Sequence, residues 1–271
     1  MKQILTFLGL AYLISWTIWF PLYGHVFGLN HLLTLPFHHA IGGLGPLIAS
    51  LLTTWIFLKA DGVKQLSKRA FQIKPVLYLA IALLGPFLLA FMASVICLFV
   101  NGAPINLSGL MMTKEFPSFN LITYFGYNLL FFGLGEETGW RGFALPRLQN
   151  KLNALSSSAV LTVFWALWHL PLFLYKPGFT TMDFAGIFGW ISSLFIGSIL
   201  LTWLYNSSRA SILICAVFHS TINMAFTAEF ADKSIVNYMG FLLTVCGIIT
   251  IILLKPKNLA KAEREKVEEF C

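Results

Sequence analysis

Charged residues are scarce in this chain of 271 residues. Asp, Glu, Lys and Arg together make up only 11% of the sequence, whereas 58% of the residues are hydrophobic and 26 are Phe. This apolar content exceeds what the core of one soluble domain could bury. The composition therefore excludes an ordinary soluble domain and predicts an all-α, polytopic membrane protein.

Cysteine is also sparse. The four cysteines are widely spaced, and Cys97, Cys215 and Cys246 lie inside apolar segments. In such surroundings Cys behaves as a small buried hydrophobe. We therefore expect neither a disulfide nor a Cys-based metal site.

The sequence contains eight apolar stretches that approach the length of a membrane span, which is about 20 residues. They cover residues 3–22, 40–58, 76–100, 119–135, 157–175, 184–205, 211–228 and 236–254. We expect residues 1–257 to form the transmembrane domain, with 119–228 as its motif-bearing core. Residues 258–271 mix Lys, Arg and Glu and predict a cytoplasmic tail that forms a solvated or membrane-surface helix.

The loops between these stretches differ in charge. Lys and Arg are concentrated in alternate loops, at Lys59, Lys64, Lys68, Arg69, Lys74, Arg141, Arg147, Lys151, Arg209, Lys255 and Lys257. The intervening loops contain only Lys114, Lys176 and Lys233. Because short cytoplasmic loops are rich in Lys and Arg, this pattern predicts a multi-pass cell-membrane protein with both termini in the cytoplasm. It also accounts for the net charge of +7 without a nucleic-acid partner.

Three apolar segments carry acid-base side chains. These side chains are Glu136, Glu137 and Arg141 in the fourth segment, His169 in the fifth, and His219 with Asn223 in the seventh. Ionisable groups at membrane depth are costly, so they usually face a polar cavity and are functional. Two carboxylates, two histidines and an amide together could activate a water and stabilise an oxyanion.

Helical spacing divides the two carboxylates. Glu137 and Arg141 are four residues apart and can pair on one face, whereas Glu136 points about 100° away and is left for another partner. The structural alternative is an ion pair at the membrane interface together with a helix–helix hydrogen bond from His169. The occurrence of such residues on three separate segments favours a functional site.

The sequence also predicts where the Glu pair, the other histidines and a glycine cluster lie. We place the Glu pair near the cytoplasmic end of its helix, where water could reach it. His25, His31, His38 and His39 are expected at the surface on the opposite side. A glycine cluster at residues 42–45, followed by Pro46, predicts close helix contact and a kink.

The three motifs together resemble a known family. Glu136-Glu137-x-x-x-Arg141, Trp165-x-x-x-His169 and His219-x-x-x-Asn223, in this order, are similar to the motifs of the CAAX protease and bacteriocin-processing family, also called CPBP or Abi. This family of intramembrane proteases includes the Ras-converting CAAX endopeptidases. The resemblance covers about residues 119–228. One departure is Trp165, where the family usually has Phe.

The resemblance implies an eight-helix membrane enzyme that cleaves peptide bonds inside the bilayer or at its face. Carried over from the family, Glu136 would activate the attacking water, and His169 would help to hold that water. His219 and Asn223 would stabilise the tetrahedral oxyanion. The expected partners are the lipid bilayer and a peptide or membrane-protein substrate, and a peptide precursor or bacteriocin is favoured over a prenylated protein.

The resemblance leaves the metal open. It implies that Glu137 and Arg141 support the site, and it places the chain among metalloproteases. The sequence lacks His-Glu-x-x-His, in which one helix presents two zinc ligands and a base. Glu136, His169 and His219 could still bind Zn²⁺, because three protein ligands and a water suffice. We favour a glutamate-activated water without an obligatory metal.

Two other functions remain open at the level of the sequence. One is a non-catalytic bacteriocin-immunity or peptide-binding membrane protein. The other is a proton-coupled transporter, because Glu and His at membrane depth also build proton relays. The pattern of apolar segments shows no internal repeat of the kind that many transporters have. The sequence determines neither the substrate nor the oligomeric state.

Overall fold

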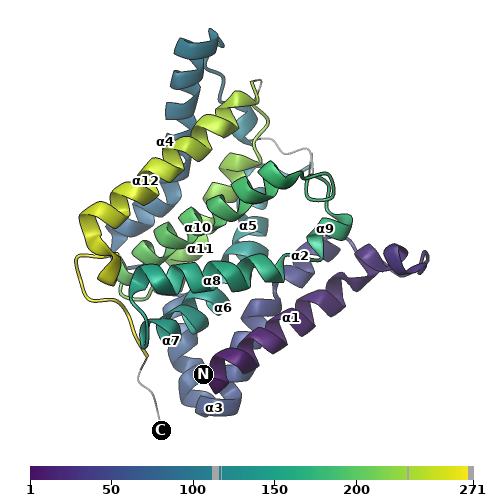
Figure 1. The fold of residues 1–271 in the computed structure, drawn as a ribbon, viewed down its shortest axis with the longest axis vertical. Helices are drawn as coiled ribbons and strands as arrows, with labels where there is room; N and C mark the ends of the chain where they lie inside the picture. Colours follow the sequence, from purple (N-terminus) through teal and green to yellow (C-terminus); the bar gives the residue numbers. More distant parts are fainter. Residues whose placement is uncertain (112–115, 117, 231, 268–271) are drawn as a thin grey trace.

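The computed structural model describes residues 1–111, 116, 118–230 and 232–267. Over these residues the chain is helical and contains no strand, which confirms the all-α prediction (Figure 1). The α-helices are α1 (Lys2–Tyr23), α2 (His38–Gly43), α3 (Gly45–Ala70), α4 (Val76–Asn101), α5 (Leu121–Asn128), α6 (Gly135–Gly139), α7 (Leu145–Gln149), α8 (Ala154–Trp168), α9 (Leu172–Tyr175), α10 (Phe184–Ser207), α11 (Ile212–Phe226) and α12 (Ser234–Asn258).

Six helical segments of the described chain are long and apolar enough to cross a membrane. They are Lys2–Phe27, His38–Ala70, Val76–Asn101, Ala154–Tyr175, Phe184–Ser207 and Ser234–Asn258. These segments correspond to six of the eight predicted spans and support a multi-pass membrane protein. The seventh predicted span is α11, which is apolar but has only 15 residues. The fourth lies in a charged helical run, so the count of eight stays a prediction.

This helical run joins α5, α6 and α7 without a break from residue 121 to 149. It contains two π-helical segments, Leu129–Leu134 and Trp140–Ala144, on either side of α6. Such segments are rare and occur frequently at functional sites. Glu136 lies near the middle of the run. The prediction that the Glu pair lies near one end of its helix is therefore wrong, because the helix continues beyond the pair to Gln149.

Glycine lets α6 approach α3 closely. A Cβ atom at Gly139 would lie 2.6 Å from Cβ of Pro46 and 2.7 Å from its carbonyl oxygen. The helix is interrupted at Leu44, which separates α2 from α3, and α3 itself departs from helical geometry at Lys59, where φ is 55°. The glycine and proline cluster therefore forms the close contact expected from the sequence, and it holds α3 against the helix that carries the Glu pair.

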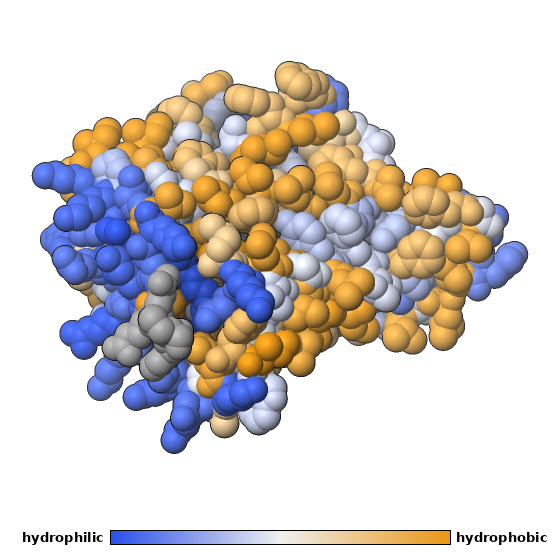
Figure 2. Space-filling view, turned by 60° about the horizontal axis from the view of Figure 1, so that its bottom comes forward, coloured by the Kyte–Doolittle hydropathy of each residue, from blue (hydrophilic) through white to orange (hydrophobic). Residues whose placement is uncertain are grey.

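Both ends of the described chain lie at the same end of the molecule. Nε of Arg147 donates to Oε1 of Gln3 at 2.7 Å, and Nδ2 of Asn150 donates to the carbonyl of Val267 at 3.0 Å. We call the surface formed by residues 59–74, 147–151, 209 and 255–267 the basic face. It lies at the lower left of Figure 1, and Figure 2 shows hydrophilic residues gathered at the left beside a largely hydrophobic surface. Termini on one face fit an even number of crossings.

The structure of the C-terminal tail differs from the helix that the sequence predicted. Residues 259–267 form no helix, and Leu259 and Ala260 are buried. The charge pattern of the tail is compatible with a helix, but Leu259 ends α12 in the left-handed region with φ 47°. The backbone N–H of Glu265 then donates to Oδ1 of Asn206 at 3.1 Å, so a tertiary contact replaces a helical hydrogen bond. Residues 268–271 lie outside the described residues.

Candidate active site

The three sequence motifs meet at one cavity. Its volume is about 290 Å³, and its lining includes Glu136 from α6, Trp165 and His169 from the end of α8, and His219 and Asn223 from α11. Glu137 and Arg141 lie behind this lining and are fully buried. The structure therefore brings together every residue that the sequence assigned to the site.

The carboxylate of Glu137 anchors the site. Its Oε1 accepts hydrogen bonds from Nη1 of Arg141 at 3.0 Å and from Nδ1 of His219 at 2.7 Å. The predicted pairing of Glu137 with Arg141 is thus confirmed. Because Nδ1 of His219 donates to a carboxylate, Nε2 is the ring nitrogen left for the cavity. One buried charge therefore neutralises the arginine and orients the histidine.

Trp165 orients the two remaining cavity groups. Its Nε1 donates to Oε2 of Glu136 at 2.7 Å, and its carbonyl accepts from Nδ1 of His169 at 2.7 Å. That carbonyl is free for the imidazole because the backbone N–H of His169 bonds to Ala166 instead, where α8 ends. One oxygen of Glu136 and Nε2 of His169 are left for a ligand in the cavity.

The indole of Trp165 also explains the departure from the family pattern. A Phe at this position could not donate to Glu136, whereas the indole N–H does so. The ring also lies 4.7 Å from the guanidinium carbon of Arg141, within the range of a cation–π contact. Trp165 thus bonds directly to Glu136. It also packs on Arg141, which is the partner of Glu137.

His39 lines the same cavity, which the sequence did not predict. Its Nδ1 lies 2.8 Å from the hydroxyl of Tyr175, and its ring stacks on Trp19 at 5.6 Å between centroids. The assignment of His39 to the surface on the side opposite the Glu pair is wrong, because the Glu pair lies in mid-helix and α2 reaches the cavity. His25 and His31 are exposed, as predicted, and His38 is half-buried.

Sequence reasoning also missed Asn128, a buried cavity residue. It is 2% exposed, and its Nδ2 donates to the carbonyl of Tyr124 at 3.0 Å. Its side-chain oxygen remains as a further polar group at the cavity wall. An amide inside the fourth apolar segment was the available signal, since polar side chains at membrane depth are uncommon.

The predicted zinc ligands do not form a metal site as they are placed. Glu136, His169 and His219 have the donor types that Zn²⁺ prefers. However, no group of three or more His, Cys, Asp or Glu side chains could hold a metal ion anywhere in the described part of the chain. We therefore derive no catalytic step through a metal from this arrangement.

Comparison with known proteins agrees with the motifs. A helical site that combines two adjacent carboxylates with two histidines has the side chains of a hydrolase site. A family model described as type II CAAX prenyl endopeptidase Rce1-like matches residues 118–225. CAAX prenyl protease 2 from Methanococcus maripaludis is 34% identical over 94 residues, which are 33% of this chain and 34% of that protein.

The family model covers the part of the chain that carries the three motifs. The matches support the resemblance of this part of the chain to the CAAX protease and bacteriocin-processing family. The match spans only about a third of the length of the curated relative. What the relative's name says of its activity is therefore a starting point for a proposal on this chain.

We expect Trp165→Phe to lower the free energy of unfolding by about 1.5–3 kcal/mol, because Glu136 loses a donor to a buried charged group. The matched control is Trp168→Phe. Trp168 is 1% exposed, and its Nε1 has no hydrogen-bond partner in the described structure, so this change removes similar volume without a hydrogen bond. Thermal unfolding in detergent measures both variants, and equal losses of stability would contradict the assigned role of the indole N–H.

Proposed function

We propose that the protein is an intramembrane endopeptidase that hydrolyses peptide bonds of a membrane-associated peptide or protein. The observation that carries this proposal is that two adjacent carboxylates have different surroundings. Glu137 is neutralised behind the cavity by Arg141 and His219, whereas Glu136 lines the cavity with His169. The cavity is thus lined by a base, by a second side chain that can bind the attacking water, and by a hydrogen-bond donor for the oxyanion.

Hydrolysis would begin at a water held between Glu136 and Nε2 of His169. Glu136 takes a proton from this water while the water oxygen attacks the scissile carbonyl carbon. The carbonyl oxygen becomes an oxyanion, which the amide of Asn223 and protonated Nε2 of His219 stabilise by hydrogen bonds. The carboxylate of Glu137 favours this protonated imidazole. Glu136 then passes its proton to the leaving nitrogen, and the C–N bond breaks to give a carboxylate and an amine.

We expect Glu136→Gln to slow cleavage of a reconstituted peptide library by about 10²–10⁴-fold, because the amide cannot accept the proton of the water. His169→Ala should also slow it. Glu263→Gln is the control, because Glu263 is exposed and lies outside the cavity. Undiminished cleavage by both cavity variants would contradict the proposal. Binding without cleavage, even by the wild type, would favour the peptide-binding alternative.

The same assay addresses the metal. We expect cleavage to persist after treatment with a chelator, because Glu136 lines the cavity and can itself accept the proton of the water. Loss of cleavage that added Zn²⁺ restores would instead show that a metal completes the site.

We further infer that the substrate enters from the side opposite the basic face. Lys176, Phe179 and the exposed Thr227 line the cavity, and the hydroxyl of Tyr124 lies 2.8 Å from Oγ1 of Thr227. Tyr124 is near the start of the helical run that ends at the basic face. If the basic face lies in the cytoplasm, the mouth of the cavity opens on the opposite side of the membrane. An exported peptide, or a membrane-protein segment exposed on that side, therefore fits better as a substrate than a prenylated protein in the cytoplasm.

Cysteine labelling tests this orientation. In a background without the native cysteines, Thr227→Cys in intact cells should react with a membrane-impermeant maleimide. Lys151→Cys, on the basic face, should react only after permeabilisation. The reverse pattern would place the cavity mouth in the cytoplasm and would contradict the inferred route, while leaving the peptidase proposal in place.

A further inference from the structure

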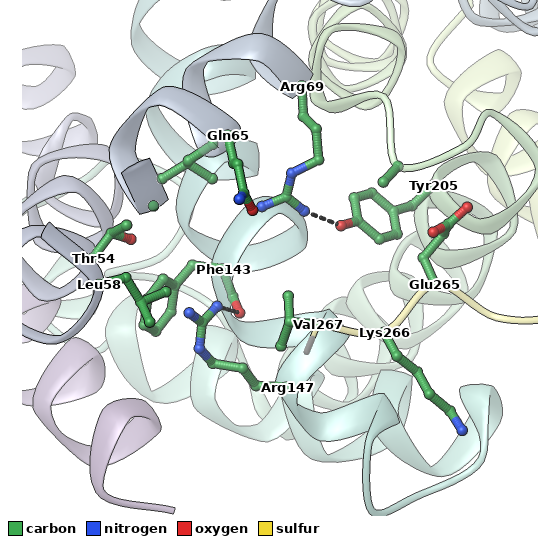
Figure 3. A pocket seen from close by; sticks show the side chains of 13 residues that line it. Thr54, Leu58, Gln65, Arg69, Phe143, Arg147, Tyr205, Glu265, Lys266 and Val267 are labelled. Carbon is green, nitrogen blue, oxygen red and sulfur yellow. Dashed lines mark hydrogen bonds between the residues drawn. The ribbon is translucent and has the colours of Figure 1, made fainter. Parts of the chain in front are cut away.

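A second cavity lies at the basic face (Figure 3). Its volume is about 220 Å³, far above the roughly 10–15 Å³ that one water needs. It is lined by parts of α3, the end of the helical run, the end of α10 and the tail. Among the described residues it shares no lining residue with the active-site cavity, and Arg147 is about 16 Å from Glu136 along the helix.

Two arginines line this cavity and have only neutral partners. Arg69 donates from Nη1 to the hydroxyl of Tyr205 at 2.6 Å, and Arg147 donates from Nη1 to the carbonyl of Phe143 at 2.9 Å. The guanidinium carbon of Arg147 also lies 3.6 Å from the centre of the Phe143 ring. Within the described residues, neither guanidinium lies within 4 Å of a carboxylate oxygen. Within the described residues, two guanidinium groups therefore line one cavity without an ion-pair partner.

The two charges affect each other. Burial lowers the pKa of the Arg147 guanidinium, and the positive charge of Arg69 lowers it further. An anion in the cavity would relieve both the repulsion and the partial loss of solvation. Guanidinium groups match the oxygen atoms of phosphate especially well, because their N–H groups form a rigid planar fork.

The tail supplies one carboxylate to the lining of this cavity. Glu265 lines the cavity beside Tyr205, as Figure 3 shows, and its backbone is held by the side chains of Gln149 and Asn206. Burial raises the pKa of Glu265, and the positive charges of Arg69 and Arg209 oppose this rise. Glu265 is thus close enough to act on Arg69 electrostatically but forms no ion pair with it, so it would compete weakly with an external anion.

The rest of the lining is mixed, and Thr54, Gln65 and Lys266 are its polar members. Its apolar members are Leu58, Leu66, Phe143 and Val267. A cavity lined by both guanidinium groups and apolar side chains suits a phosphate ester that carries a hydrocarbon part. Its place on the basic face also fits the anionic headgroup layer of a cytoplasmic leaflet, which attracts Lys and Arg.

We propose that this cavity binds a phosphate group between Arg69 and Arg147. The phosphate could belong to an anionic phospholipid headgroup or to a small soluble phosphate ester. The site is separate from the peptidase site, so this proposal does not depend on whether the protein cleaves peptides.

Ligand-dependent thermal unfolding tests the site, because a ligand that binds the folded state raises the midpoint. The full-length protein in detergent is titrated with phosphatidylglycerol, with phosphatidylcholine of the same acyl chains, and with glycerol 1-phosphate. We expect phosphatidylglycerol to raise the midpoint. Arg147→Gln and Arg69→Gln should each require about tenfold more lipid for the same rise.

Two further variants keep the test decisive even if an arginine variant is unstable. Glu265→Gln leaves both guanidiniums in place and removes the competing carboxylate, so it should require less lipid than wild type. Lys151→Gln removes one positive charge from the same face outside the cavity and should behave as wild type. A rise with glycerol 1-phosphate alone would support the site with a soluble ligand. No rise with either ligand, or equal weakening by Lys151→Gln and Arg147→Gln, would overturn the proposal.

Discussion

The site depends on one buried carboxylate that has two donors. A fully buried guanidinium in an apolar helical protein requires a negative partner, since an unpaired buried charge is strongly destabilising. Glu137 provides this charge to Arg141 and with the same oxygen atom fixes the imidazole of His219. The link joins α6 to α11. It also commits Glu137 to structure, which leaves Glu136 as the carboxylate available for chemistry.

One helical run connects the two cavities of the molecule. The helical run 121–149 carries Glu136 at its centre and Arg147 near its last turn, so it connects the active-site cavity with the basic face. Close contact at Gly139 fixes this run against α3, and α3 in turn brings Arg69 to the second cavity. The candidate active-site cavity and the proposed anion site are thus both lined by residues of one helical run.

Composition and helical spacing were enough to predict the helical membrane fold and most of the candidate site. The apolar stretches and the pairing of Glu137 with Arg141 depend on local periodicity, which a sequence displays directly. The convergence of the three motifs was expected from their polar side chains at membrane depth and from the family resemblance. Contacts between distant segments could not be predicted in this way. His39 reaches the cavity through the path of α2, and the tail loses its expected helix because Asn206 and Gln149 bond its backbone. The role of Trp165 depends on side-chain orientation, which no spacing rule specifies.

The central claim is that the two adjacent carboxylates have opposite roles, and unfolding of Glu137→Gln and Glu136→Gln in the same detergent tests it most directly. Glu137→Gln should lower the free energy of unfolding by about 3–5 kcal/mol, because Arg141 is left as an uncompensated buried charge. Glu136→Gln should leave stability unchanged or raise it, since it removes a carboxylate that is only 4% exposed and has no cationic side chain bonded to it. Equal losses, or a larger loss for Glu136→Gln, would contradict the division of roles between Glu136 and Glu137.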